Sequence, residues 1–62
     1  MRRIFRLKQV MTMTGLGRSC IYAVVAEARF PASVKLGPRA VGWVEQEIED
    51  WIEARIAERD EG

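Results

Sequence analysis

Apolar residues, together with one threonine, recur at helical spacing twice in the first half of the chain. The two sets are Leu7, Val10, Met11 and Thr14, followed by Ile21, Val24, Val25 and Ala28. Each set has the i, i+3, i+4, i+7 spacing of one face of a helix. Gly15 suits the left-handed residue that ends a helix, and Gly17 can serve as an N-cap. The pattern predicts a helix over 7–14 and a second helix over about 18–28, with Leu16 buried between them.

A β-hairpin is predicted over residues 32–44. Phe30 and Pro31 end the preceding helix, because proline prevents its continuation. Val34 and Leu36 then share one face at the period of a strand. Residues 37–39 read Gly-Pro-Arg, which is typical of a turn, and the following residues bring the chain back. Near the N-terminus, Ile4 and Phe5 are expected to form a short strand.

The last segment predicts an amphipathic helix. Its expected buried stripe consists of Val44, Ile48, Trp51, Ile52, Arg55 and Ile56. Acidic residues fill the other faces, which is typical of a solvated helix surface. Residues 59–62 are expected to fray.

Four residues are assigned by their chemical type. Trp43 and Trp51 are predicted to anchor the core, since large aromatic side chains dominate the burial in small domains. Cys20 is predicted to be a small buried residue. Gly42 is expected where a strand bends or packs closely against a neighbour.

The composition excludes several classes of protein. The 62 residues predict one domain, 1–62, with a single small core of marginal stability. The chain has no histidine and one cysteine, so we expect no disulfide, no metal site, no cofactor and no enzymatic activity. No stretch is long and apolar enough to span a membrane, and no signal peptide is evident. These features predict a cytoplasmic protein.

The net charge of +1 conceals two oppositely charged halves. Residues 1–42 hold eight basic residues and one acidic residue, a net charge of +7. Residues 43–62 hold two basic and eight acidic residues, a net charge of −6. Such asymmetry indicates a basic face that meets a polyanion, although a polarised solvated surface would have the same composition.

The second predicted helix carries the residues best suited to contact double-stranded DNA. Arg18, Ser19 and Tyr22 lie opposite its apolar stripe, where they can donate hydrogen bonds to phosphates or base edges. Arg29 is predicted to lie on the same outward face. Lys35 and Arg39 lie near the tip of the hairpin, and a wing at this place would touch the DNA backbone. The remaining basic residues of this half add non-specific attraction: Arg2, Arg3, Arg6 and Lys8.

Residues 6–56 resemble the AlpA family of phage-type transcriptional regulators. The matching motifs are R-L-K-x-V from Arg6, T-G-L-x-R-S-x-I-Y from Thr14, F-P at 30–31, K-L-G-x-R-x-x-G-W from Lys35 and E-x-E/D-x-W-I from Glu47. As a set these motifs are specific, although no single one is.

The resemblance implies a small winged helix-turn-helix of the excisionase and MerR type, an α+β fold that is mostly helical. Its recognition helix, about 18–28, would enter the major groove. The wing, about 32–44, would contact the backbone or the minor groove. By position, the resemblance assigns DNA recognition to Arg18, Ser19 and Tyr22, with Lys35 and Arg39 in the wing. It also implies regulation of prophage or mobile-element genes, often integrase or excision functions.

The chain departs from the family pattern at three positions. Gly17 stands where relatives often have serine, and Ala23 and Val44 stand where basic residues are common. These changes weaken a helix cap and remove two expected phosphate contacts. Two alternatives therefore stay open: an excisionase-type factor that bends DNA, or a module that binds a protein such as an integrase or a response regulator. The sequence leaves the oligomeric state undetermined, and a core this small is compatible with self-association or with cooperative assembly along repeated DNA sites.

Overall fold

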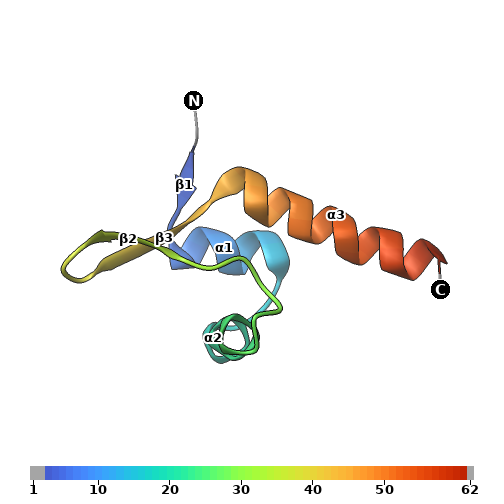
Figure 1. Cartoon of the computed structure of the whole chain (residues 1–62), viewed down its shortest axis with the longest axis horizontal. Helices are drawn as coiled ribbons and strands as arrows, with labels where there is room; N and C mark the ends of the chain where they lie inside the picture. Colours follow the sequence, from blue (N-terminus) through green and yellow to red (C-terminus); the bar gives the residue numbers. More distant parts are fainter. Residues whose placement is uncertain (1–2, 62) are drawn as a thin grey trace.

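The computed structural model describes residues 3–61, which form three helices and a three-stranded antiparallel sheet (Figure 1). The elements in chain order are β1 (Ile4–Phe5), α1 (Leu7–Thr14), α2 (Arg18–Ala26), β2 (Val34–Gly37), β3 (Ala40–Val44) and α3 (Glu45–Glu61). This arrangement confirms the predicted α+β class, including the short N-terminal strand, the two-helix unit, the hairpin and the C-terminal helix.

Helix α1 has the predicted bounds because each of its ends is fixed locally. At its start, the Arg6 backbone N–H donates a hydrogen bond to Gln9 Oε1 at 2.9 Å. At its end, Gly15 adopts the left-handed conformation with φ 75°, and its N–H donates to the Met11 carbonyl at 2.9 Å. Glycine takes this conformation without steric cost, so the chain can turn sharply after Thr14.

Helix α2 begins at Arg18 as predicted but ends at Ala26, two residues early. Ala28 has a left-handed φ of 57°. Its N–H donates to the Val25 carbonyl at 3.0 Å, and the Arg29 N–H donates to the Val24 carbonyl at 2.9 Å. These two bonds are those of a Schellman C-cap with alanine in the position that usually holds glycine. The prediction that Ala28 lies on the buried stripe is therefore wrong, and its side chain is exposed.

The sheet has the strand order β1-β3-β2, so the hairpin strand β3 lies in the centre. Ile4 pairs with Val44 and Phe5 with Trp43 on one side, while Val34 pairs with Gly42 on the other. Val44 is thus the last residue of strand β3. The prediction that it begins the buried stripe of the C-terminal helix is wrong. Its backbone is held in the ladder to β1, and α3 starts at the next residue.

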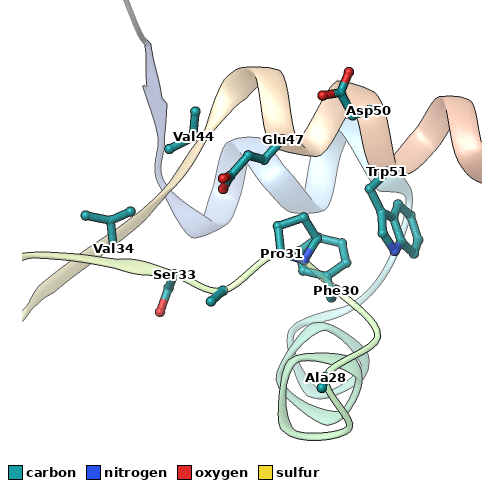
Figure 2. A pocket seen from close by; sticks show the side chains of 10 residues that line it. Ala28, Phe30, Pro31, Ser33, Val34, Val44, Glu47, Asp50 and Trp51 are labelled. Atoms are coloured by element: carbon teal, nitrogen blue, oxygen red, sulfur yellow. The ribbon is translucent and has the colours of Figure 1, made fainter.

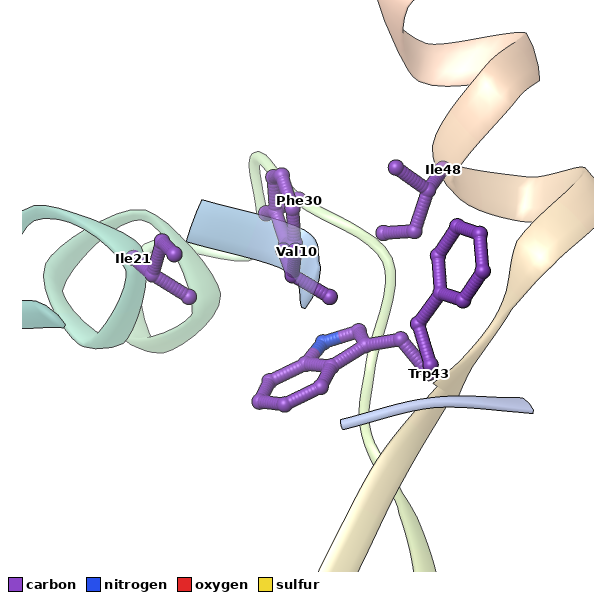
Figure 3. Close-up of a cluster of buried hydrophobic side chains, with 6 residues drawn as sticks. Val10, Ile21, Phe30, Trp43 and Ile48 are labelled. Atoms are coloured by element: carbon purple, nitrogen blue, oxygen red, sulfur yellow. The ribbon is translucent and has the colours of Figure 1, made fainter. Parts of the chain in front are cut away.

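The core lies between the sheet and the three helices (Figure 3). It contains Phe5, Val10, Ile21, Phe30, Trp43 and Ile48. Trp43 is fully buried, which confirms its predicted role. Trp51 is half-buried and packs against this cluster from α3, as does Leu16 from the turn before α2. Cys20 is exposed, so its predicted burial is wrong: it lies on the first turn of α2, before the buried Ile21.

Helix α3 runs past the rest of the body towards the C-terminus (Figure 1). The helix continues to Glu61, so the predicted fraying does not occur over 59–61; residue 62 lies outside the described residues. Because few elements face the second half of α3, Ile56 is exposed although the pattern placed it on the buried stripe. Among residues 3–61, no helix has the length and apolar character needed to cross a membrane.

Candidate nucleic-acid interface

Helices α1 and α2 form a helix-turn-helix unit joined by residues 15–17. In Figure 1, α1 runs across the view while α2 is seen end-on, so the two axes cross steeply. The fully buried Val10 of α1 and Ile21 of α2 belong to the same core cluster. This packing fixes the orientation of α2 and leaves its opposite side to solvent.

The solvent side of α2 carries the three residues singled out from the sequence. Arg18, Ser19 and Tyr22 are all exposed. Tyr22 is 48% exposed although the neighbouring Ile21 is fully buried, which shows how sharply the helix divides into two sides. Gly17 is the N-cap and has no side chain to cap the helix, so among residues 3–61 no side chain competes with an anion for the N–H groups of the first turn.

Arg29 does not belong to this surface, contrary to the prediction. It follows the end of α2, and its guanidinium lies 3.6 Å from the Glu27 carboxylate. Its backbone carbonyl accepts a hydrogen bond from Trp51 Nε1 at 2.8 Å. Arg29 therefore serves the C-terminal cap of α2. Cys20 is exposed on the first turn of α2, next to Arg18 and Ser19. The helical pattern of the sequence alone could not indicate this exposure.

The hairpin of β2 and β3 projects from the body on the side away from the C-terminal end of α3 (Figure 1). Lys35 on β2 and Arg39 in the turn are both exposed. The hairpin thus has the form of a wing with two basic side chains on it.

The N-terminal basic residues differ in their surroundings. Arg6 and Lys8 are exposed at the start of α1. Arg3 is engaged within the fold, since its guanidinium lies 3.3 Å from the Glu45 carboxylate and 6.0 Å from the centre of the Phe5 ring. Arg2 lies outside the described residues.

Ion pairing separates the basic residues into two groups. Within residues 3–61 the ion pairs are Arg3–Glu45, Arg29–Glu27, Arg55–Glu58 and Arg59–Asp60. Over the same residues, five cations take part in no ion pair: Arg6, Lys8, Arg18, Lys35 and Arg39. Within these residues the cations of α3 therefore each have a carboxylate nearby, whereas those at the start of α1, on α2 and on the wing are available to an external anion.

The described part of the chain has no group of three or more histidine, cysteine, aspartate or glutamate side chains arranged to hold a metal ion. The exposed residues of the helix-turn-helix and the hairpin provide hydrogen-bond donors and positive charge.

Comparison with known proteins identifies two similar proteins. The uncharacterized protein ORF88 of enterobacteria phage P4 is 40% identical over 60 residues, covering 97% of this chain and 68% of the relative. The DNA-binding transcriptional activator AlpA of Escherichia coli strain K12 is 39% identical over 59 residues, covering 86% of this chain and 84% of the relative. No solved structure matches the chain. The model of the family described as prophage CP4-57 regulatory protein (AlpA) matches residues 3–56, and the chain therefore belongs to the AlpA family of phage regulators.

Proposed function

We propose that residues 1–62 form one DNA-binding domain that regulates transcription of prophage or mobile-element genes. The family relationship supports a DNA-binding regulator, and the relative in Escherichia coli is named as a DNA-binding transcriptional activator. The distribution of charge supports the same function, because within residues 3–61 the cations outside any ion pair lie at the start of α1, on α2 and on the hairpin.

Helix α2 is the recognition helix in this proposal. The major groove of B-DNA is about 12 Å wide and admits one α-helix. With its N-terminal turn in the groove, α2 would present Arg18 to a guanine edge or a phosphate. Ser19 and Tyr22 would donate to phosphates or base edges from the same side, and the free N–H groups of the first turn would bind a phosphate.

The wing and the start of α1 would hold the backbone on either side of α2. Lys35 and Arg39 are exposed on the hairpin, and Arg6 and Lys8 are exposed at the start of α1. Contacts of this kind add affinity that does not depend on sequence and that falls as salt rises.

One observation carries the proposal most strongly. Within residues 3–61, the basic side chains of the helix-turn-helix and the wing have no acidic partner, whereas Arg55 and Arg59 of α3 are both paired. A surface that only kept the protein soluble would not require unpaired cations on one side and paired cations on α3. A surface that binds phosphates requires unpaired cations, since each of them can replace a counterion on DNA.

Two arginine substitutions test the recognition role of α2. Arg18→Ala should weaken binding to the cognate duplex about 5-fold to 150-fold, which is the range for losing a contact to a base edge. Arg59→Ala is the matched control, because Arg59 is also an exposed arginine on a helix but pairs with Asp60. Fluorescence anisotropy with the element's own promoter and attachment-site duplexes measures both, and circular dichroism checks that the fold is intact.

The outcomes separate recognition from general attraction. Equal losses for Arg18→Ala and Arg59→Ala would contradict the assignment of α2 as the recognition helix. Lys35→Ala should instead weaken binding to all duplexes alike and reduce the slope of log affinity against log salt by about 0.9. Bending of attachment-site DNA, measured by the distance between fluorophores at its ends, would assign an excisionase-type role within the same proposal.

A further inference from the structure

An open groove of about 690 Å³ lies between α3 and the segment that follows α2 (Figure 2). Its apolar lining includes Phe30, Pro31, Val34, Val44 and Trp51. Glu47 and Asp50 of α3 also line it, and Figure 2 shows Glu47 reaching from α3 towards the strand side of the groove. The groove lies beyond the C-terminal end of α2, whereas the proposed DNA contacts begin at its N-terminal end.

The walls of this groove are held in place by two indoles. Trp51 Nε1 donates to the Arg29 carbonyl at 2.8 Å, and Trp43 Nε1 donates to the Pro31 carbonyl at 3.0 Å. The Phe30 and Trp51 rings also meet edge to face, with their centres 4.9 Å apart. Because the segment is fixed before any partner arrives, binding there would cost little ordering of the chain.

The groove continues onto the face of the sheet that points away from the core. Ile4 pairs with Val44 and Val34 pairs with Gly42, so these residues share one face. Leu36 lies on that face as well, since its Cδ1 would be 3.0 Å from a Cβ at Gly42. Ile4, Val34 and Leu36 are 38%, 40% and 46% exposed. We call the groove and these three side chains together the outer surface.

The charge of the outer surface is negative. Within residues 3–61, Glu47 and Asp50 take part in no ion pair, and Asp50 accepts only a hydrogen bond from Gln46 Nε2 at 2.9 Å. The described residues that line the groove include no lysine or arginine. Glu49 and Glu53 line an adjoining hollow on α3. DNA would be repelled here, and a binder must offer both apolar side chains and positive charge.

We propose that the outer surface binds a segment of a partner protein that carries large apolar side chains flanked by lysine or arginine. Its apolar side chains occupy the groove against Phe30 and Trp51 and extend over the exposed sheet face. Its cations pair with Glu47 and Asp50.

Val34 and Leu36 lie on the hairpin, but on the face of the sheet opposite to Lys35, which pairs with Val41. The surface contains no residue of α2 and none of the proposed DNA contacts, so one molecule can hold DNA and the partner together. The domain thus links a DNA site to a second protein.

A pair of synthetic peptides tests this chemistry. One contains 14 residues with paired leucines separated by paired lysines, and the other has glutamate in place of lysine. Each is titrated into the ¹⁵N-labelled chain of 62 residues at about 0.15 M salt, where weak surface attraction is screened. We expect the lysine peptide alone to shift the amide resonances of residues 28–34 and 44–51, with little change over residues 18–22.

Two charge reversals on α3 provide the matched comparison. Glu47→Lys should weaken binding of the lysine peptide about threefold to tenfold, because an attraction becomes a repulsion. Glu61→Lys makes the same change of charge at the far end of the same helix and should alter the affinity less than twofold. Both variants should bind DNA at least as well as the unmodified protein, because neither residue belongs to the proposed DNA surface.

Four results of the peptide titrations would overturn the proposal. They are equal binding of the two peptides, shifts confined to residues 18–22, 35 and 39, equal effects of the two reversals, and no binding at about 1 mM peptide. Shifts of the groove residues that depend on protein concentration without any peptide would also overturn it, since a second copy of the chain would then be the occupant.

Discussion

Ala28→Gly should stabilise this protein, although the change removes a methyl group. Ala28 occupies the C′ position of the Schellman cap that ends α2, with φ 57°. A side chain with a Cβ meets the following carbonyl in this conformation, which is why glycine is common there. The Ala28 side chain is exposed, so its removal leaves no cavity in the core.

The size of the gain is the difference between two opposing effects. Relief of the left-handed strain is worth about 1 to 2 kcal/mol. The greater freedom of glycine in the unfolded chain costs about 0.5 to 1 kcal/mol. We therefore expect a net stabilisation of about 0.5 to 1 kcal/mol. A chain of 62 residues should have a total stability of about 3 to 9 kcal/mol, so the gain should be measurable.

Thermal unfolding followed by circular dichroism measures this change. A gain of about 0.5 to 1 kcal/mol should raise the Tm of Ala28→Gly by about 2 to 8 °C. Ala23→Gly is the control, because Ala23 is also an exposed alanine but lies in the interior of α2. There glycine should cost about 0.8 to 1 kcal/mol and lower Tm by a similar amount. A loss of stability at both positions would refute the left-handed cap and would place Ala28 in a continuing helix.

Three further substitutions probe the fold. Gly42→Ala should lower the free energy of unfolding in urea by about 1 to 3 kcal/mol, because the new Cβ would clash with Ile4 Cγ2. An unchanged free energy of unfolding would show that β1 moves away from β3 without cost. Trp43→Phe should cost about 1 to 3 kcal/mol, since the Pro31 carbonyl loses its donor; a neutral result would mean that this bond contributes nothing. Gly17→Ser should add a few tenths of a kcal/mol by capping α2, measured as a small rise in Tm, and a fall would contradict the N-cap assignment.

The two helices of the N-terminal half show what the sequence can and cannot predict about the fold. Helix α1 was predicted with its exact bounds because its apolar pattern and Gly15 end at the same place. In α2 the apolar pattern continues to Ala28, but the backbone leaves the helix at Ala26. Only the hydrogen bonds of the cap reveal this end, because alanine is a strong helix former and carries no stop signal.

The burial of single residues depended on the tertiary environment. The aromatic residue type predicts the burial of Trp43 correctly. Trp43 is fully buried because it lies on the core side of β3, the strand between β1 and β2. Ile56 follows Ile48 at helical spacing but lies in the second half of α3, and it is 38% exposed whereas Ile48 is fully buried. Cys20 was assigned from the usual burial of its residue type, and its position on the first turn of α2 overrides that tendency.

The candidate site was predicted in part. Arg18, Ser19 and Tyr22 lie on the exposed side of α2 as the periodicity indicates, and the roles proposed for them stay predictions until DNA binding is measured. The outer surface could not be predicted, because its residues come from segments 28–36 and 44–51 and from β1. Such a surface exists only once β3 lies between β1 and β2 and α3 faces the loop after α2.

The measurement that tests the central claim most directly is anisotropy of the unmodified protein with three labelled duplexes across a salt series. The duplexes are the element's own promoter, its attachment site and a random genomic fragment. We predict tighter binding to one of the first two that persists near 0.15 M salt, while binding to the random fragment falls steeply. Equal binding to all three that disappears with salt, or no binding at low salt, would contradict a sequence-specific DNA-binding regulator.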